Sequence, residues 1–317
     1  MEQYQFEDAL TGTTVTCGFP QLEAVVTPGS DEPHRCASLF FPGCSFINYG
    51  LPLVQAVYNT LVDAGRVDGI SLLCCGKILS YEPDGDAVRA SFEDQLRDGL
   101  VAAQVERVVA ACPNCVMALR AALAADERTA PIEVVALPAV LADLGYRIDD
   151  EAARGMVARE AGLDPADVKV CVHDSCPDRD TGEFADGLRA LLPDGLMVET
   201  DHIRKRSYCC GSLLRAAGKP FVADAMAQRH GEEAQAVEAS AIVTACMSCS
   251  FQLTVSQSTV PVFHYLELLY DWRINWEGTD LYMKLRFLFD DALGAVEGTG
   301  GSRAFAALDA LTAGEDS

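Results

Sequence analysis

The chain has 317 residues, half of them apolar, and its 24 basic and 47 acidic residues give a net charge of −23. This acidic balance excludes the basic surface that nucleic-acid binding needs and disfavours contact with an acidic membrane face. There is no apolar run of about 18 residues and no signal-peptide pattern at the start, so we expect no membrane span. Thirteen cysteines without a secretion signal predict a cytoplasmic protein whose reduced thiols bind metal or do redox chemistry.

Short apolar segments alternate with helical patterns along the chain. Strands are expected at residues 37–43, 70–76, 107–112, 132–137, 168–176, 196–200, 241–246 and 260–265. Helices are expected at residues 51–65, 86–104, 114–125, 148–161, 181–192 and 221–238, with a further helix starting at the motif near 246. This alternation predicts an α/β fold with parallel sheets covered by helices.

Ten of the thirteen cysteines form a tandem repeat. The corresponding positions are Cys44 and Cys176, Cys74–Cys75 and Cys209–Cys210, and Cys112/Cys115 and Cys246/Cys249, separated by 132, 135 and 134 residues. Nearly equal separations indicate a duplicated unit. Free cysteine is among the most buried residue types, so the unmatched Cys17, Cys36 and Cys171 are expected to pack in the core.

Each half carries a cysteine after its first strand, an adjacent pair before glycine, and a C-x-x-C motif at a helix start. Neighbouring side chains on a strand point to opposite faces, so the pair can serve one site only if the chain turns. Gly76 and Gly211 supply the freedom for that turn. Strand ends at one edge of a parallel sheet meet at one place, where such folds put their sites.

Three kinds of chemistry compete for these thiols. Zinc takes four thiolates in a closed tetrahedron, which leaves one cysteine over in each half. A thioredoxin-like dithiol would use the C-x-x-C motif alone and would leave the adjacent pair unexplained. An iron–sulfur cluster uses several thiolates on several irons, so it accommodates the whole set and is the favoured interpretation.

The spacing of one cysteine, a C-C-G motif and a C-x-x-C motif resembles the cysteine-rich CCG domain, and two copies in one chain resemble the B subunit of heterodisulfide reductase. The iron–sulfur subunits of glycolate oxidase, lactate-utilisation and anaerobic glycerol-3-phosphate dehydrogenase systems are also similar. The resemblance implies two Rossmann-like halves related by a pseudo-twofold axis, each with a noncubane [4Fe-4S] cluster. The implied ligands are Cys44, Cys74, Cys75, Cys112, Cys115, Cys176, Cys209, Cys210, Cys246 and Cys249. Zinc in the N-terminal half is the alternative, because the first gap is shorter there.

The resemblance also implies an oxidoreductase subunit that acts on a small disulfide or thiol substrate. The electrons would come from a flavoprotein or a ferredoxin-like subunit, since the chain has neither a G-x-G-x-x-G fingerprint nor a ferredoxin motif. The alternative is an electron-transfer subunit that relays electrons for a partner flavin dehydrogenase.

A few residues outside the cysteine set are weaker candidates for the site. His173 and Asp174 precede a predicted ligand and could hydrogen-bond the cluster or its cysteines, while Lys77 and Arg179 could hold an anionic substrate. His264, at a strand end, is expected to be structural.

The predicted domains are an N-terminal extension at 1–36, cysteine-rich domains at 37–147 and 148–272, and a C-terminal helix and mobile tail at 273–317. The apolar stripe of that helix comprises Leu281, Leu285, Leu288 and Phe289 and would pack on the core or dock a partner.

Overall fold

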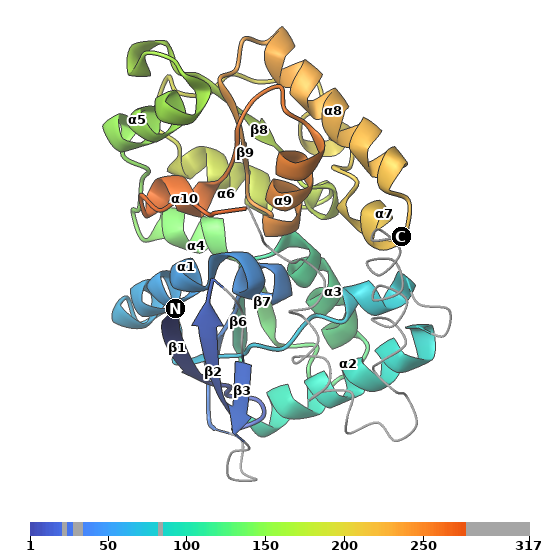
Figure 1. Cartoon of the computed structure of the whole chain (residues 1–317). Helices are drawn as coiled ribbons and strands as arrows, with labels where there is room; N and C mark the ends of the chain where they lie inside the picture. The colour runs from blue at the N-terminus through green and yellow to red at the C-terminus, as the bar shows by residue number, and fades with distance from the viewer. Residues whose placement is uncertain (21–23, 28–33, 82–84, 277–317) are drawn as a thin grey trace. The chain divides into compact units, whose positions relative to one another are not determined.

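The chain forms two compact units in a computed structural model (Figure 1). The structure describes residues 1–20, 24–27, 34–81 and 85–276. The first unit comprises Met1–Val109 and Ala118–Val134, and the second comprises Ala110–Met117 and Val135–Trp276. The predicted domain boundary at 147/148 stays a prediction, and the predicted C-terminal stripe lies outside the described residues.

The four-stranded sheet lies mostly in the first unit. Its strands are β4 (Ser38–Phe41), β5 (Gly69–Ile70), β6 (Arg107–Ala110) and β7 (Glu133–Ala136), in the order β5-β4-β6-β7. β4 and β5 are parallel, with Leu39 opposite Gly69. Buried apolar side chains dominate these strands, as expected for a parallel sheet covered on both faces.

The helices that follow these strands are α1 (Cys44–Asp63), α2 (Gly85–Ala102) and α3 (Pro113–Ala124), with the 3-10 helix η1 (Lys77–Tyr81) ahead of α2. α1 begins at Cys44, seven residues earlier than predicted, because a first turn precedes a kink. The kink is at Gly50, where φ is −134° and ψ is 41°, two residues before Pro52. Proline cannot donate the helical hydrogen bond, so the chain departs from helix geometry there.

The second unit contains a smaller parallel sheet. Its strands are β8 (Val170–His173), β9 (Ala241–Thr244) and β10 (Val262–His264), in the order β10-β9-β8. Val172 pairs with Val243, and Ile242 pairs with Val262. The α/β fold class with parallel sheets is therefore confirmed in both units.

Helices of the second unit agree with the predicted pattern and add short elements. They are α4 (Leu137–Asp143), α5 (Asp150–Ala161), α6 (Glu183–Leu191), α7 (Ser212–Ala216), α8 (Pro220–Ala236), α9 (Met247–Ser256) and α10 (Tyr265–Leu269). Three 3-10 turns complete the unit: η2 (Pro165–Asp167), η3 (Cys176–Asp178) and η4 (Arg204–Arg206). α5 shows how local sequence sets an element, because the Asp149 side chain caps its first turn and Gly162 ends it in the left-handed region.

Two predicted strands are corrected by the structure. The segment predicted at 70–76 pairs only over Gly69–Ile70, and the segment predicted at 196–200 makes a single bridge, between Met197 and Val170. Met197 thus neighbours β8 as β5 neighbours β4. In both halves this edge of the sheet is short, because the chain leaves it to reach the loop that carries the adjacent cysteines.

An antiparallel sheet precedes the first repeat, in a region for which the sequence predicted no structure. Its strands are β1 (Glu2–Glu7), β2 (Thr14–Phe19) and β3 (Ala24–Thr27), in that order. Asp8, directly after β1, is 2% exposed and accepts hydrogen bonds from Ser71 Oγ (2.9 Å) and the Leu72 amide (2.6 Å). The extension is thereby fastened to the segment that leads into Cys74.

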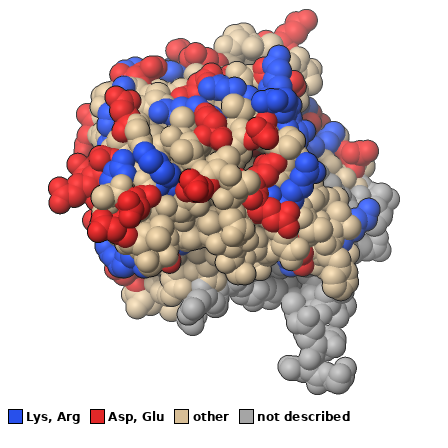
Figure 2. Space-filling model, turned by 90° about the horizontal axis from the view of Figure 1, so that it is seen from above, with Lys and Arg blue, Asp and Glu red and all other residues tan. Residues whose placement is uncertain are grey.

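Acidic and basic side chains are intermixed on the face drawn in Figure 2. Among the described residues, no helix is both long and apolar enough to cross a membrane.

Candidate metal centre

Each adjacent cysteine pair is followed by a glycine in a left-handed conformation. The φ angle is 71° at Gly76 and 95° at Gly211, which side chains rarely adopt. A Cβ atom on Gly211 would lie 2.7 Å from the Cα of Ala223 in α8, and one on Gly76 would lie 2.7 Å from the Phe92 ring. The turn expected from the sequence is therefore present at both pairs, and each is closely packed against a helix.

All five cysteines of the second repeat lie in the second unit: Cys176, Cys209, Cys210, Cys246 and Cys249. The Cys210 thiol donates to Cys249 Sγ over 3.3 Å. The thiol of Cys209 is hydrogen-bonded to those of Cys176 and Cys210, and the thiol of Cys249 to that of Cys246. The five sulfur atoms therefore form one continuous cluster, in which Cys210, Cys246 and Cys249 are buried.

Hydrogen bonding makes Cys209 the most acidic thiol of this cluster. Its pKa is lowered by hydrogen bonds from the Cys176 and Cys210 thiols and by the Gly211 amide, which donates over 3.4 Å. The pKa of Cys176 is raised by the same hydrogen bond to Cys209 and by burial. Because the thiolate is the form that binds metal, the lowered pKa favours the ligating form of Cys209.

The loop before Cys209 is fastened to the end of β8 by a buried ion pair. Asp174, 4% exposed, accepts from Arg189 Nη1 (2.7 Å), Arg189 Nη2 (3.0 Å) and the Arg204 amide (2.8 Å). Its backbone carbonyl also accepts from Ser207 Oγ, and Arg189 reaches Glu199 over 2.8 Å. Asp174 therefore holds the pair's loop beside the strand that leads to Cys176, rather than binding the cluster itself.

Arg215 fastens the other side of the pair, and sequence reasoning did not find it. Its Nε donates to Gln252 Oε1 (2.8 Å) and its Nη2 to Ser256 Oγ (2.9 Å), while Asp224 of α8 accepts from Nη2 as well. These bonds join α7, which follows the cysteine pair, to α9, which carries Cys249. Gln252 and Ser256 are 37 and 41 residues away from Arg215 in the sequence, so no local pattern could have shown these contacts.

A group of aromatic rings lies beside Cys210 and Cys249 in the second unit. The rings of His173 and His230 meet edge to face with centroids 4.4 Å apart, and Tyr208 stacks on His230 at 4.0 Å. Burial lowers the pKa of His173 to about 4 and that of His230 to about 2, so both imidazoles are neutral at neutral pH. A ring nitrogen of His173 and the sulfurs of Cys210 and Cys249 all lie within 4.8 Å of one another.

The predicted ligands of the first repeat fall in different units. In the first unit, the thiol of Cys74 is hydrogen-bonded to those of Cys44 and Cys75. Cys112 and Cys115 fall in the second unit, where the Cys112 thiol is hydrogen-bonded to Cys115 and to Cys246. The set of the second repeat is thus gathered within one unit, whereas the set of the first repeat is not.

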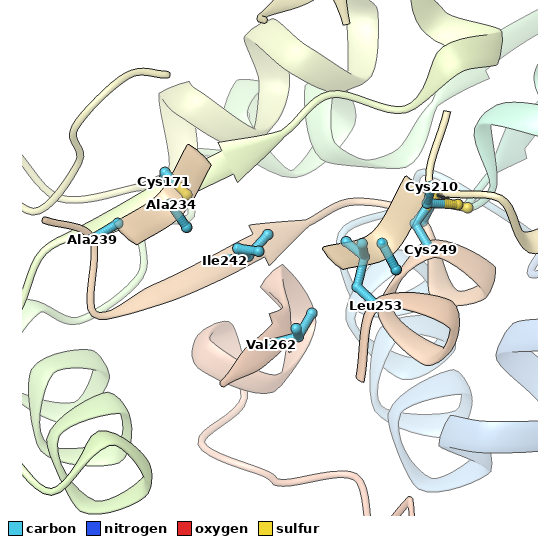
Figure 3. Close-up of a cluster of buried hydrophobic side chains, with 10 residues drawn as sticks. Cys171, Cys210, Ala234, Ala239, Ile242, Cys249, Leu253 and Val262 are labelled. Carbon is cyan, nitrogen blue, oxygen red and sulfur yellow. Dashed lines mark hydrogen bonds between the residues drawn. The ribbon is translucent and has the colours of Figure 1, made fainter. Parts of the chain in front are cut away.

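The cysteines outside the repeat lie in the core, as expected. Cys17, Cys36 and Cys171 are at most 3% exposed, and burial raises the pKa of each to about 12. In Figure 3, Cys171 lies at one end of a buried cluster, while Cys210 and Cys249 lie at the other end. Cys171 is therefore remote from the thiol cluster.

The charged and histidine candidates take different positions. Lys77 opens η1 directly after Gly76 and is half-buried. Arg179 follows η3, and its Nε is buried without a hydrogen-bond partner among the described residues. His264 is structural: its ring accepts from the Leu266 amide (3.4 Å), and its own amide donates to buried Glu267 (2.6 Å).

The chemistry of the donor set fits a metal cofactor of the thiolate-binding type. Seven hydrogen-bonded thiols converge in the second unit, the five of the second repeat together with Cys112 and Cys115, and a tetrahedral zinc site uses only four. Iron–sulfur clusters are held by such thiolates, and a helix start with a left-handed glycine turn supplies amides that can hydrogen-bond sulfur. The fold and this site define a duplicated, thiol-rich α/β protein that supports iron–sulfur binding.

The sequence profile of the cysteine-rich domain, CCG, matches the chain twice, over residues 38–120 and 170–254. Because these matches cover more than half of the chain, the protein belongs to the CCG cysteine-rich domain family. The domain is typical of iron–sulfur oxidoreductase subunits. No protein of curated function matches the chain.

Several solved structures show a weak likeness in fold. Glutamate racemase from Francisella tularensis is 13% identical with a TM-score of 0.33, and the alignment covers 82% of this chain and 94% of the racemase chain. The RacE1 glutamate racemase from Bacillus anthracis is 12% identical with a TM-score of 0.31, covering 74% and 79%. An aspartate racemase homologue from Pyrococcus horikoshii is 12% identical with a TM-score of 0.28, covering 81% and 98%. Likeness at this level carries no functional conclusion.

Proposed function

We propose that this protein is the iron–sulfur subunit of a cytoplasmic oxidoreductase that reduces or forms a small disulfide, as the B subunit of heterodisulfide reductase does. The observation that carries the proposal is the cluster of five thiols in the second unit, at the ends of β8 and β9. Cys176, Cys209, Cys210, Cys246 and Cys249 would hold one noncubane [4Fe-4S] cluster. The matched cysteines Cys44, Cys74, Cys75, Cys112 and Cys115 would hold a second.

Two clusters would suit disulfide chemistry because of electron count. A cluster supplies or accepts one electron at a time, whereas reduction of a disulfide to two thiols consumes two electrons and two protons. The chain itself carries no flavin or nicotinamide fingerprint, so the electrons would come from a flavoprotein or ferredoxin-like subunit. The residues of the chain would hold the clusters, fix the loops around them and exclude water from the buried thiols.

Metal and sulfide analysis of anaerobically purified protein tests the cofactor. We expect about eight irons and a similar amount of acid-labile sulfide per chain, four of each for every [4Fe-4S] cluster. Cys209→Ala should lose the iron of the second site, while Cys171→Ala, a buried cysteine outside the thiol cluster, is the matched control and should keep it. Stoichiometric zinc without sulfide would contradict the proposal.

Disulfide turnover tests the reaction. With an artificial reductant, the protein should consume a small disulfide and release two thiols for every two electrons, and Cys209→Ala should abolish this activity. A protein that loads its clusters but consumes no disulfide, and instead passes electrons from a flavin dehydrogenase to an acceptor, would be a relay subunit.

A further inference from the structure

His173 presents a buried polar atom that the rest of the protein leaves unbonded. The side chain is 5% exposed, and Nε2 has no hydrogen-bond partner among the described residues. Leaving such an atom unpaired is costly, because burial removes the water that would otherwise bond it. An unpaired buried nitrogen therefore indicates a partner that is bound to the protein.

The surroundings of the ring restrict which partner that is. The carboxylate of the neighbouring Asp174 is occupied by Arg189 and by the Arg204 amide, so it does not serve His173. His230 meets the His173 ring edge to face, and Tyr208 stacks behind His230. On the remaining side, a ring nitrogen lies within 4.8 Å of Cys210 Sγ and Cys249 Sγ. The ring and these thiols border the same small volume.

We propose that His173 is a positioning residue whose imidazole N–H donates to a sulfur atom at the second thiol cluster and thereby raises the reduction potential of the group bound there. The inference rests on the proposed iron–sulfur function. Hydrogen bonds to the sulfur atoms are among the factors that set the potential of such clusters, because they stabilise the more negative, reduced state. A neutral imidazole has one N–H to give, and sulfur is an acceptor for it.

The first repeat lacks this donor. The first cysteines of the two repeats are Cys176 and Cys44. Three residues before each of them, the second repeat has His173 and the first repeat has Phe41, which is 1% exposed. Phe41 packs in the core and has no hydrogen to donate. The repeat has therefore kept its thiols and changed this neighbour, so the second site should have the higher potential of the two.

Redox titration followed by EPR measures the effect directly. His173→Phe copies the residue of the first repeat, His173→Gln keeps an N–H donor, and Tyr208→Phe leaves the stacked ring in place as the control. The titration is done in wild type and in a Cys74→Ala background, so that the signal of the second site is read alone. In His173→Phe we expect the one-electron equilibrium to shift at least tenfold towards the oxidised state, about 59 mV for one electron. His173→Gln should restore at least half of the shift, and Tyr208→Phe should leave the potential unchanged.

Pulsed EPR on the wild-type protein and on His173→Phe gives a second test. We expect a weak coupling to one imidazole nitrogen and to a proton that exchanges in D₂O, both lost in His173→Phe. A strong coupling typical of direct iron–nitrogen ligation would overturn the proposal, since His173 would then be a ligand. An unchanged potential in a His173→Phe protein with full iron content would overturn it as well. Absence of iron and sulfide from wild type would instead refute the proposed function.

Discussion

The two loops that carry the adjacent cysteines are both held by a buried aspartate, but the aspartates come from different parts of the chain. In the second repeat, Asp174 directly follows the strand of its own repeat and accepts from the Arg204 amide and, through its backbone, from Ser207. In the first repeat, Asp8 comes from the N-terminal extension and accepts from Ser71 and Leu72. Ser207, Ser71 and Leu72 lie two or three residues before the first cysteine of their pair, and Arg204 lies five residues before it. Duplication thus preserved the thiols and the turn, while the means of fixing the loop diverged.

The same divergence extends to the atoms around the sulfur sites. The second repeat has His173, Asp174 and Arg179 near its lead cysteine, where the first has Phe41, Pro42 and Ile47. Phe41 and Ile47 are buried in the core. The second cluster would have polar neighbours and the first would have apolar ones. The two clusters would then differ in reduction potential, because hydrogen bonding and burial both change the potential of such groups.

The glycines after the pairs should show the largest difference between the repeats. Gly211→Ala forces a Cβ against the backbone of Ala223 at φ 95°, so relaxation would have to move α8. We expect a loss of about 4 kcal/mol in the free energy of unfolding, the sum of overpacking and left-handed strain. Gly76→Ala meets only the Phe92 ring, which can turn aside, and should lose about 2 kcal/mol.

Urea denaturation and iron content measure both glycine variants. Gly211→Ala should lose the iron of the second site, and Gly76→Ala should retain more iron than it does. Equal losses of stability and iron in the two variants would contradict this prediction, because they would show that α8 can move aside as easily as the Phe92 ring.

Asp174→Asn should have the next largest effect. The change removes the charge that the buried Arg189 guanidinium faces and turns one acceptor into a donor. We expect a loss of about 3 kcal/mol, because breaking a buried ion pair leaves an uncompensated charge, although Glu199 still contacts Arg189. Hydrogen exchange should increase over residues 204–210 and stay unchanged over residues 71–76.

Asp8→Asn is the matched change in the first unit. Asp8 accepts on both oxygens, from the Leu10 (3.0 Å) and Thr11 (3.1 Å) amides and from Ser71 and Leu72, so an amide nitrogen would face a donor. Among the described residues, no arginine is paired with this carboxylate, and we expect a smaller loss of about 2 kcal/mol. The increase in hydrogen exchange should now fall on residues 71–76. If either variant increased hydrogen exchange in both loops, the two aspartates would not hold their loops independently, and the prediction would be wrong.

The sequence predicted the parts of this protein that depend on residue type. Buried apolar runs predicted β4, β6, β8 and β9, since a strand covered on both faces requires such residues. The set of candidate metal ligands could be predicted because cysteine is the only residue type that supplies a thiolate. The predicted strand at 196–200 is wrong because apolar residues there pack beside a loop and bridge the sheet once.

Contacts between segments distant in the chain could not be predicted. Asp8 with Leu72, Asp174 with Arg189, and Arg215 with Gln252 each join residues that no local pattern links. The antiparallel sheet of β1, β2 and β3 was also missed, although Tyr4 and Phe6 in β1 and Val15 and Cys17 in β2 alternate with polar residues, which is the pattern of a half-buried strand.

The smallest effects are expected at the buried cysteines outside the repeat, Cys36 and Cys171. Cys36→Ala removes a thiol that donates to Asp68 Oδ1 over 3.3 Å, while Asp68 keeps the Ala37 and Ser38 amides. Cys171→Ala removes an apolar contact in the core of the second unit. Each change should lower the free energy of unfolding by about 1 kcal/mol, because one sulfur atom is lost from a packed interior. Iron content and EPR spectra should match wild type in both variants, and loss of iron from Cys171→Ala would show that Cys171 also takes part in metal binding.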